Sequence, residues 1–160
     1  MKILSAILIF CLSFSSIATP PNSVAQGFEL DTLQGENFQL KDTLGQVIYL
    51  DFWASWCGPC KISFPDMIKL QTEFKTEGFL IVAISVDEDI DDATRFAQKF
   101  PVNFTILSDT EGHVAALYNV PAMPTSYLID RSGKIAHVHT GYRPGDIVQL
   151  KQKIRDLVDE

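Results

Sequence analysis

The chain has 160 residues, of which 46% are hydrophobic and 21% charged, and its formal net charge is −7. This length and composition predict one globular domain with a buried core. The negative charge argues against nucleic acid and acidic membrane surfaces as partners, because both repel an acidic protein.

The N-terminal stretch has the pattern of an export signal. Lys2 supplies a positive charge, an apolar run over residues 3–12 follows, and Ser16-Ile17-Ala18 forms a small-residue cleavage site. The apolar run is shorter than the roughly 20 residues that span a bilayer. We therefore expect a signal peptide at residues 1–18 and one domain at residues 19–160, periplasmic or otherwise extracytoplasmic. An uncleaved leader would give a membrane-anchored form.

The first elements of the mature chain are predicted to be short strands. Residues 20–26 form a polar lead-in that we expect to be mobile. Apolar and polar residues alternate over residues 28–30 and 38–40, which predicts a small hairpin. Residues 47–53 are almost continuously apolar, which predicts a strand covered on both faces.

A Cys57-Gly58-Pro59-Cys60 turn follows that strand and begins a helix. Two residues between the cysteines place them one helical turn apart, close enough for the sulfurs to bridge. The pattern also occurs as half of a zinc site or as two buried thiols. Zinc requires a second ligand pair, however, and the predicted mature chain offers only three histidines and no further cysteine, because cleavage removes Cys11. The strand in front and the helix behind favour a redox pair.

The two sulfurs are expected to differ in reactivity. Cys57 lies at the N-terminus of the helix, where unpaired N–H groups and the helix dipole stabilise a thiolate and lower the pKa of the thiol. Cys60 lies inside the first turn and faces the core, so it should be the less accessible thiol, which resolves a mixed disulfide. Pro59 suits the start of a helix, and further along Pro65 predicts a kink and Gly78 the end of the helix.

The second half of the chain is predicted to alternate strands and helices. Residues 79–86 read as a second buried strand. The acidic run 87–92 is interpreted as charge at the start of a helix that carries Ala93, Phe96, Ala97 and Phe100 on one side. This run lacks the spacing and the glycine of a calcium-binding loop.

A short strand at residues 104–107 and a short helix at 109–118 come next. Residues 125–130 and 135–140 are then expected to form a hairpin. His137 and His139 project from one face of that hairpin and are interpreted as solvent-facing residues of an edge strand, with a metal pair as the alternative. An amphipathic helix ends the chain, and its inward residues are expected to be Ile147, Leu150, Ile154 and Leu157.

The run from Asp51 to Lys61, Asp-Phe-Trp-Ala-Ser-Trp-Cys-Gly-Pro-Cys-Lys, resembles the active-site segment of thioredoxin. With Met123-Pro124-Thr125 ahead of a strand, most of the chain after the leader resembles the exported thioredoxin-like proteins of the TlpA and ResA type. This resemblance implies a thioredoxin fold, with a central mixed sheet flanked by helices and an N-terminal β-hairpin. The strand and helix at residues 104–118 resemble the insertion that separates TlpA-type proteins from thioredoxin.

The resemblance also implies roles for residues around the cysteines. Asp51, on the strand under the active loop, is expected to exchange a proton with Cys60, and burial should raise the pKa of this carboxyl group. Pro124 matches a cis-proline that lies against the cysteines and exposes backbone to an extended substrate peptide. The substrate groove is therefore expected at Trp56, Gly58, Pro59, Met123, Pro124 and Thr125.

Two positions depart from the family pattern. ResA-type proteins resemble one another in a glutamate three residues after the second cysteine, where this chain has Ser63. This difference weakens the link to cytochrome c maturation, which the resemblance would otherwise suggest. Thioredoxin has a lysine beside its buried aspartate, and we expect Ile84 at that place, so Asp51 should be harder to ionise.

The expected function is thiol-disulfide exchange with client proteins. Reduction is the preferred direction, because Gly58-Pro59 between the cysteines resembles the reducing members of the fold. A disulfide oxidase or isomerase is the alternative enzyme, whereas a peroxiredoxin would need threonine or serine in place of Ala54. The non-enzymatic alternative is a copper-binding thiol chaperone that uses the reduced pair as soft ligands.

The expected partners are client proteins with disulfides and a membrane protein that donates electrons. We expect a monomer with no metal and no cofactor other than the Cys57–Cys60 disulfide.

Overall fold

The computed structural model describes residues 18–160, so the predicted leader lies outside the described residues except for Ala18. None of the helices in that range is long and apolar enough to cross a bilayer. The elements follow in this order: β1 (Glu29–Asp31), β2 (Asn37–Gln39), the 3-10 helix η1 (Leu40–Thr43), β3 (Val47–Trp53), α1 (Gly58–Phe74), the 3-10 helix η2 (Lys75–Glu77), β4 (Phe79–Ser85), α2 (Ile90–Ala97), β5 (Thr105–Ser108), α3 (His113–Leu117), β6 (Thr125–Ile129), β7 (Ile135–Thr140) and α4 (Asp146–Val158).

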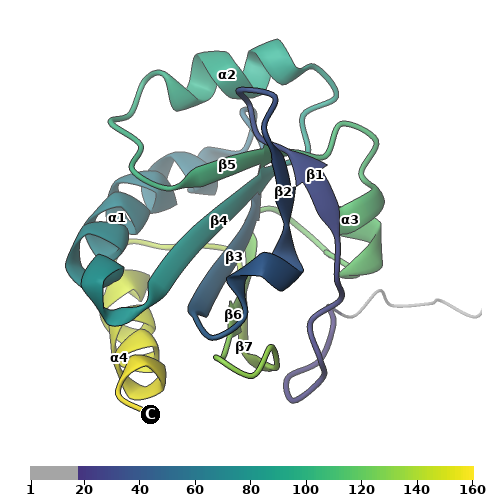
Figure 1. Cartoon of the computed structure of the whole chain (residues 1–160). Helices are drawn as coiled ribbons and strands as arrows, with labels where there is room; N and C mark the ends of the chain where they lie inside the picture. Colours follow the sequence, from purple (N-terminus) through teal and green to yellow (C-terminus); the bar gives the residue numbers. More distant parts are fainter. Residues whose placement is uncertain (1–17) are drawn as a thin grey trace, which may run out of the picture.

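The main sheet has the strand order β5-β4-β3-β6-β7, and β1 and β2 form a separate antiparallel hairpin. Strands β3, β4 and β5 are parallel, whereas β6 runs antiparallel to β3 and β7 antiparallel to β6. The central strand β3 is buried along its whole length, as its continuous apolar run predicted. The architecture is the expected thioredoxin fold with an N-terminal hairpin and an inserted strand and helix (Figure 1).

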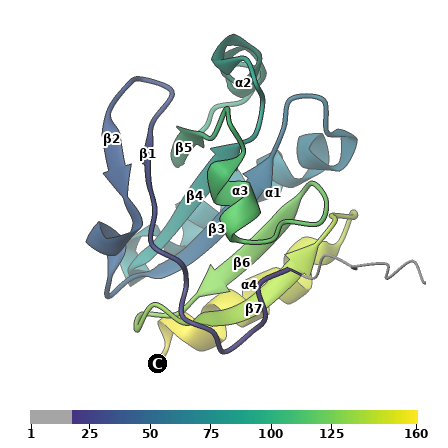
Figure 2. The ribbon, with the colours of Figure 1, turned by 90° about the vertical axis from the view of Figure 1, so that its right-hand side faces the viewer.

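The two faces of the sheet carry two separate cores. On one face, side chains of β3 such as Tyr49 and Trp53 pack against apolar residues of α1 and α4. On the other face, Leu50 and Phe52 pack against α3 and the segment that precedes β1. Figure 2 shows α3 in front of the sheet and α4 behind it. Successive residues of β3 therefore point to opposite layers.

An aromatic cluster supports α1 from below. Trp53 lies 4.8 Å from both Phe64 of α1 and Phe96 of α2, measured between ring centroids, and those two rings are 4.9 Å apart. Such tilted and edge-on contacts add to the burial energy of the rings. The cluster fixes the helix that carries the cysteine pair onto the end of β3.

Three expectations about local structure were wrong in detail. The lead-in at residues 20–26 is attached to the domain, since the Asn22 and Ala25 N–H groups donate to the carbonyl groups of Ile135 and Gly133. The helix expected at 109–118 is shorter, because Asp109 closes a turn in front of it instead. Helix α2 ends at Ala97, three residues before Phe100.

Candidate active site

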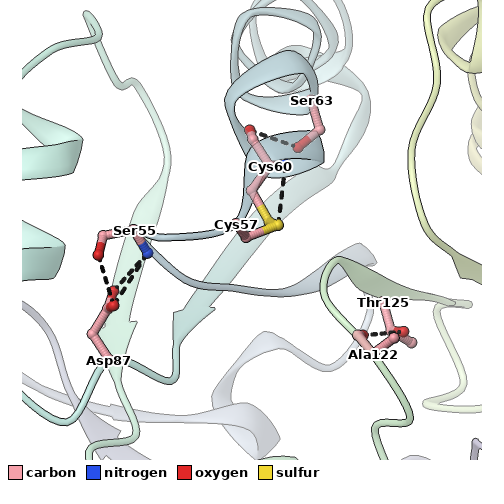
Figure 3. The surroundings of a disulfide bond; sticks show 7 residues. All are labelled: Ser55, Cys57, Cys60, Ser63, Asp87, Ala122 and Thr125. Carbon is pink, nitrogen blue, oxygen red and sulfur yellow. Dashed lines mark hydrogen bonds between the residues drawn. A yellow bond between two sulfur atoms is a disulfide. The ribbon is translucent and has the colours of Figure 1, made fainter.

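Cys57 and Cys60 form a disulfide at the start of α1, with their Cα atoms 5.3 Å apart (Figure 3). The Cys57 N–H donates to the Ala54 carbonyl, which closes a turn at the end of β3. Cys57 is then the residue that caps the helix, and its sulfur accepts a hydrogen bond from the Cys60 N–H at 3.2 Å. That N–H would stabilise a thiolate on Cys57 once the disulfide is reduced.

The two cysteines are both buried but have different neighbours. Cys57 is 4% exposed and adjoins the exposed residues Gly58 and Pro59, whereas Cys60 is 0% exposed. Cys57 is thus the cysteine beside the exposed part of the active loop.

Asp51 lies beneath this pair within the apolar core. Its side chain is on the same sheet face as Tyr49 and Trp53, the face that α1 and Cys60 cover. The residue is 1% exposed, and its Oδ2 atom has no hydrogen-bond partner. Burial raises the pKa of this carboxyl group well above its usual value. A carboxyl group with a raised pKa can accept a proton from a neighbouring thiol and return it.

The residue beside Asp51 on β4 is Ala83, not Ile84. Ile84 pairs with Phe52 and faces the opposite core. Asp51 is still hard to ionise without a neighbouring lysine, because Ala83 carries no charge. Burial is the cause that raises the pKa of Asp51.

Asp87 has a role that the sequence did not suggest. We interpreted it as helix-start charge, but Asp89 is the residue that caps α2, and Asp87 is buried beneath the active loop. Its carboxylate accepts hydrogen bonds from the N–H and the hydroxyl of Ser55, at 2.9 and 2.8 Å (Figure 3). It also accepts one from the Ser85 hydroxyl at 2.8 Å. The carboxylate therefore holds the backbone two residues before Cys57. The sequence did offer a signal for this role. Asp87 follows one buried parallel strand and Ser55 follows another, and the loops after parallel strands meet at the same edge of the sheet.

Ser63 occupies the place where the family resemblance predicts glutamate. It is fully buried on α1, and its hydroxyl donates to the Cys60 carbonyl at 3.1 Å. No carboxylate stands at this position beside the pair.

The expected groove residues divide into two groups. Trp56 is 69% exposed, and Gly58 and Pro59 are also exposed, next to Cys57. The Met123–Pro124 peptide bond is cis, Met123 is half-buried and Pro124 is buried. Their loop lies near the disulfide, as the neighbouring residues in Figure 3 show.

Thr125 does not line the groove as expected. It is 0% exposed, and its hydroxyl donates to the Ala122 carbonyl at 2.8 Å. Its side chain therefore supports the proline loop from inside and cannot touch a substrate.

The two histidines of β7 are half-buried rather than fully solvent-facing. Both lie on the sheet face that α4 covers, and they line a small cavity together with Tyr49 and Ser126. The imidazole Nε2 of His139 lies 3.2 Å from a carboxylate oxygen of Asp146. Within residues 18–160, no group of three or more His, Cys, Asp and Glu side chains is arranged to hold a metal ion.

Comparisons with known proteins agree with this geometry. Residues 21–138 match the model of the AhpC/TSA family. The chain is 38% identical to thiol-disulfide oxidoreductase ResA of Bacillus subtilis over 119 residues, which is 74% of this chain and 66% of that protein. It is 36% identical to ResA of Geobacillus kaustophilus over 124 residues, 78% of this chain and 71% of that protein. The chain thus spans about two thirds of the length of these relatives.

Solved structures show the same likeness. A thiol:disulfide interchange protein DsbE of Chlorobium tepidum is similar to this chain with a TM-score of 0.85 and 42% identity, over 88% of this chain and 99% of that one. DsbF of Mycobacterium tuberculosis gives a TM-score of 0.74 and 27% identity, over 81% and 94% of the two chains.

Proposed function

Since the chain belongs to the AhpC/TSA family and is a thiol-disulfide oxidoreductase, we propose that it reduces disulfides of client proteins outside the cytoplasm. The observation that carries this proposal is the Cys57–Cys60 disulfide at the start of α1, with the Cys60 N–H on the Cys57 sulfur and the buried carboxyl group of Asp51 on the sheet face that α1 covers. This arrangement suits an enzyme that attacks with Cys57 and resolves with Cys60.

The reaction consists of two exchanges. The Cys57 thiolate attacks one sulfur of the client disulfide, and the other client sulfur leaves as a thiolate and takes up a proton. Cys60 then gives its proton to Asp51 and attacks the Cys57 sulfur. The Cys57–Cys60 disulfide forms, the bond to the client breaks, and the second client sulfur leaves with the electron pair. The client gains two electrons and the enzyme loses two.

The groove is proposed to hold the client as an extended peptide. The exposed Trp56 supplies an apolar flank, and Gly58 and Pro59 leave Cys57 approachable. The loop with the cis Met123–Pro124 bond offers backbone groups for pairing with that peptide.

The direction, the location and the partners belong to the proposal. Gly58-Pro59 between the cysteines supports reduction, and the export-signal pattern of the leader supports an extracytoplasmic site. A membrane protein would return electrons to the pair, and the domain would act as a monomer. Ser63 in place of glutamate supports a general client reductase over a dedicated role in cytochrome c maturation. Ala54 has no hydroxyl group to offer near Cys57, which supports disulfide exchange over peroxide reduction.

Two variants test the attack and the resolution separately. Cys57→Ser is expected to abolish the reduction of insulin disulfides, whereas Cys60→Ser should accumulate a mixed disulfide between Cys57 and the client. Activity that survives Cys57→Ser would overturn the proposed nucleophile. The reduction potential of the pair tests the direction, because a strongly oxidising value would indicate an oxidase or isomerase.

A further inference from the structure

A row of polar side chains crosses the sheet from Asp51 toward its outer edge. Asp51 of β3 is directly opposite Ser126 of β6, and Ser126 is directly opposite His139 of β7. Residues that oppose each other on antiparallel strands point to the same face, with Cβ atoms about 5 Å apart. The row therefore consists of a carboxyl group, a hydroxyl group and an imidazole group at consecutive steps across three strands.

The row begins in the core and ends at solvent. Asp51 and Ser126 are buried, whereas the His139 side chain is 41% exposed. At the outer end, His139 lies 3.2 Å from a carboxylate oxygen of Asp146 at the start of α4. A proton that reaches the imidazole can therefore pass to water.

A cavity of about 30 Å³ lies along the row and is lined by Ser126 and His139. This volume holds one or two water molecules, and the hydroxyl and imidazole groups around it supply the partners that such waters need. The titratable groups that face the row are Tyr49 of β3, His137 of β7, Asp146 and Lys153 of α4, Tyr142 ahead of α4, and Asp66 of α1, which accepts from the Tyr142 hydroxyl.

The electrostatics connect the cavity with Asp51. Burial and then the negative charge of Asp51 raise the pKa of Tyr49, while a hydrogen bond with Ser126 lowers it in part. Tyr49 and Ser126 line the cavity, and Asp51 is the buried residue opposite Ser126 on the neighbouring strand.

The proposed function creates a need for such a route. Because burial favours the protonated form of Asp51, the carboxyl group must often lose its proton before it can accept that of Cys60. Asp51 is only 1% exposed, so its carboxyl group has no direct contact with water.

We propose that Ser126 and His139, with water in the adjoining cavity, carry protons between Asp51 and solvent during the second exchange. This inference rests on the proposed function and concerns its second exchange. Ser126 and His139 act through Asp51 and touch neither sulfur of the reacting pair.

The test separates the two exchanges with a small aromatic disulfide, dithiobis(nitrobenzoate), in a full chain that also carries Cys11→Ser. The reduced protein releases one coloured thiolate when Cys57 attacks, and a second when Cys60 resolves the adduct. Ser126→Ala and His139→Ala are expected to slow the second release about tenfold and to leave the first unchanged. Imidazole added to His139→Ala should restore the second rate, and Ser126→Thr, which keeps the hydroxyl group, should retain it.

His137→Ala is the matched control, because His137 lines the same cavity but is opposite the apolar Leu128. It should leave both releases at the wild-type rate. The proposal is overturned by a wild-type second release in Ser126→Ala and His139→Ala, or by equal slowing in His137→Ala. Failure of the proposed function would show itself differently, as a first release that survives Cys57→Ser.

Discussion

Replacing Asp87 by alanine should destabilise the protein more than the removal of any exposed carboxylate. The substitution deletes the acceptor of three hydrogen bonds, from the Ser55 N–H, the Ser55 hydroxyl and the Ser85 hydroxyl. Ser85 is fully buried, so its hydroxyl group is left without an acceptor, at a cost of about 1–3 kcal/mol. Ser55 is half-buried, so water can replace the carboxylate there, and each of its two bonds is worth about 1 kcal/mol.

The sum predicts a loss of about 3–5 kcal/mol for Asp87→Ala, which is a large part of the stability of an ordinary domain. Asp87→Asn keeps one acceptor oxygen but turns amide hydrogens toward donors, so we expect it to lower the free energy of unfolding by about 2–3 kcal/mol. Urea unfolding of the oxidised protein measures both values.

Glu88→Ala is the matched control, because Glu88 is the adjacent carboxylate and is exposed. It should change the free energy of unfolding by less than about 0.5 kcal/mol. A loss below about 1 kcal/mol for Asp87→Ala, or one equal to that of Glu88→Ala, would refute the reasoning that Asp87 anchors the loop.

Three further predictions follow from the site. Burial raises the pKa of Asp51 in the folded state above its unfolded value of about 4. Between these two pKa values the folded state binds more protons than the unfolded state, so the free energy of unfolding falls by about 1.4 kcal/mol for each unit that the pH rises. Asp51→Asn should remove this slope, and unchanged pH dependence in urea titrations would contradict the burial argument. Trp56→Ala should raise the KM for a client peptide and change the unfolding free energy by less than about 0.5 kcal/mol, since the side chain is exposed; an unchanged KM would remove Trp56 from the groove. Thr125→Val should cost about 1 kcal/mol through the lost bond to the Ala122 carbonyl, and a urea midpoint equal to that of wild type would contradict this supporting role.

The sequence predicted the elements whose patterns are local. The apolar run at residues 47–53 is β3 without a shift, and Gly78 ends the helical segment with a left-handed backbone conformation, φ 74°. The spacing of Cys57 and Cys60 likewise predicted their positions at the start of α1. In each case the residue pattern and the structural element occupy the same few positions.

The wrong predictions concern residues whose environment comes from distant segments. Asp87 was assigned to the nearest helix start, but its partner Ser55 is 32 positions away. The edge-strand position of His139 is confirmed, but the sequence of β7 does not reveal that residues of α4 lie against that face and cover part of the imidazole. Thr125 adjoins the cis-proline in sequence, yet it is the first residue of β6, an interior strand of the sheet that is buried along its whole length.

The chain carries two tryptophans, and the fold gives them opposite surroundings. Trp53 is enclosed by Phe64 and Phe96 beneath the cysteine helix, whereas Trp56 is largely in water beside Cys57. An indole in an apolar enclosure fluoresces at shorter wavelength than a hydrated one. The short-wavelength emission, from Trp53, should therefore report the reduction and formation of the Cys57–Cys60 disulfide. The long-wavelength emission, from Trp56, should report the binding of a client. Intrinsic fluorescence of the unlabelled protein would thus report client binding and the redox state of the cysteine pair at two different wavelengths.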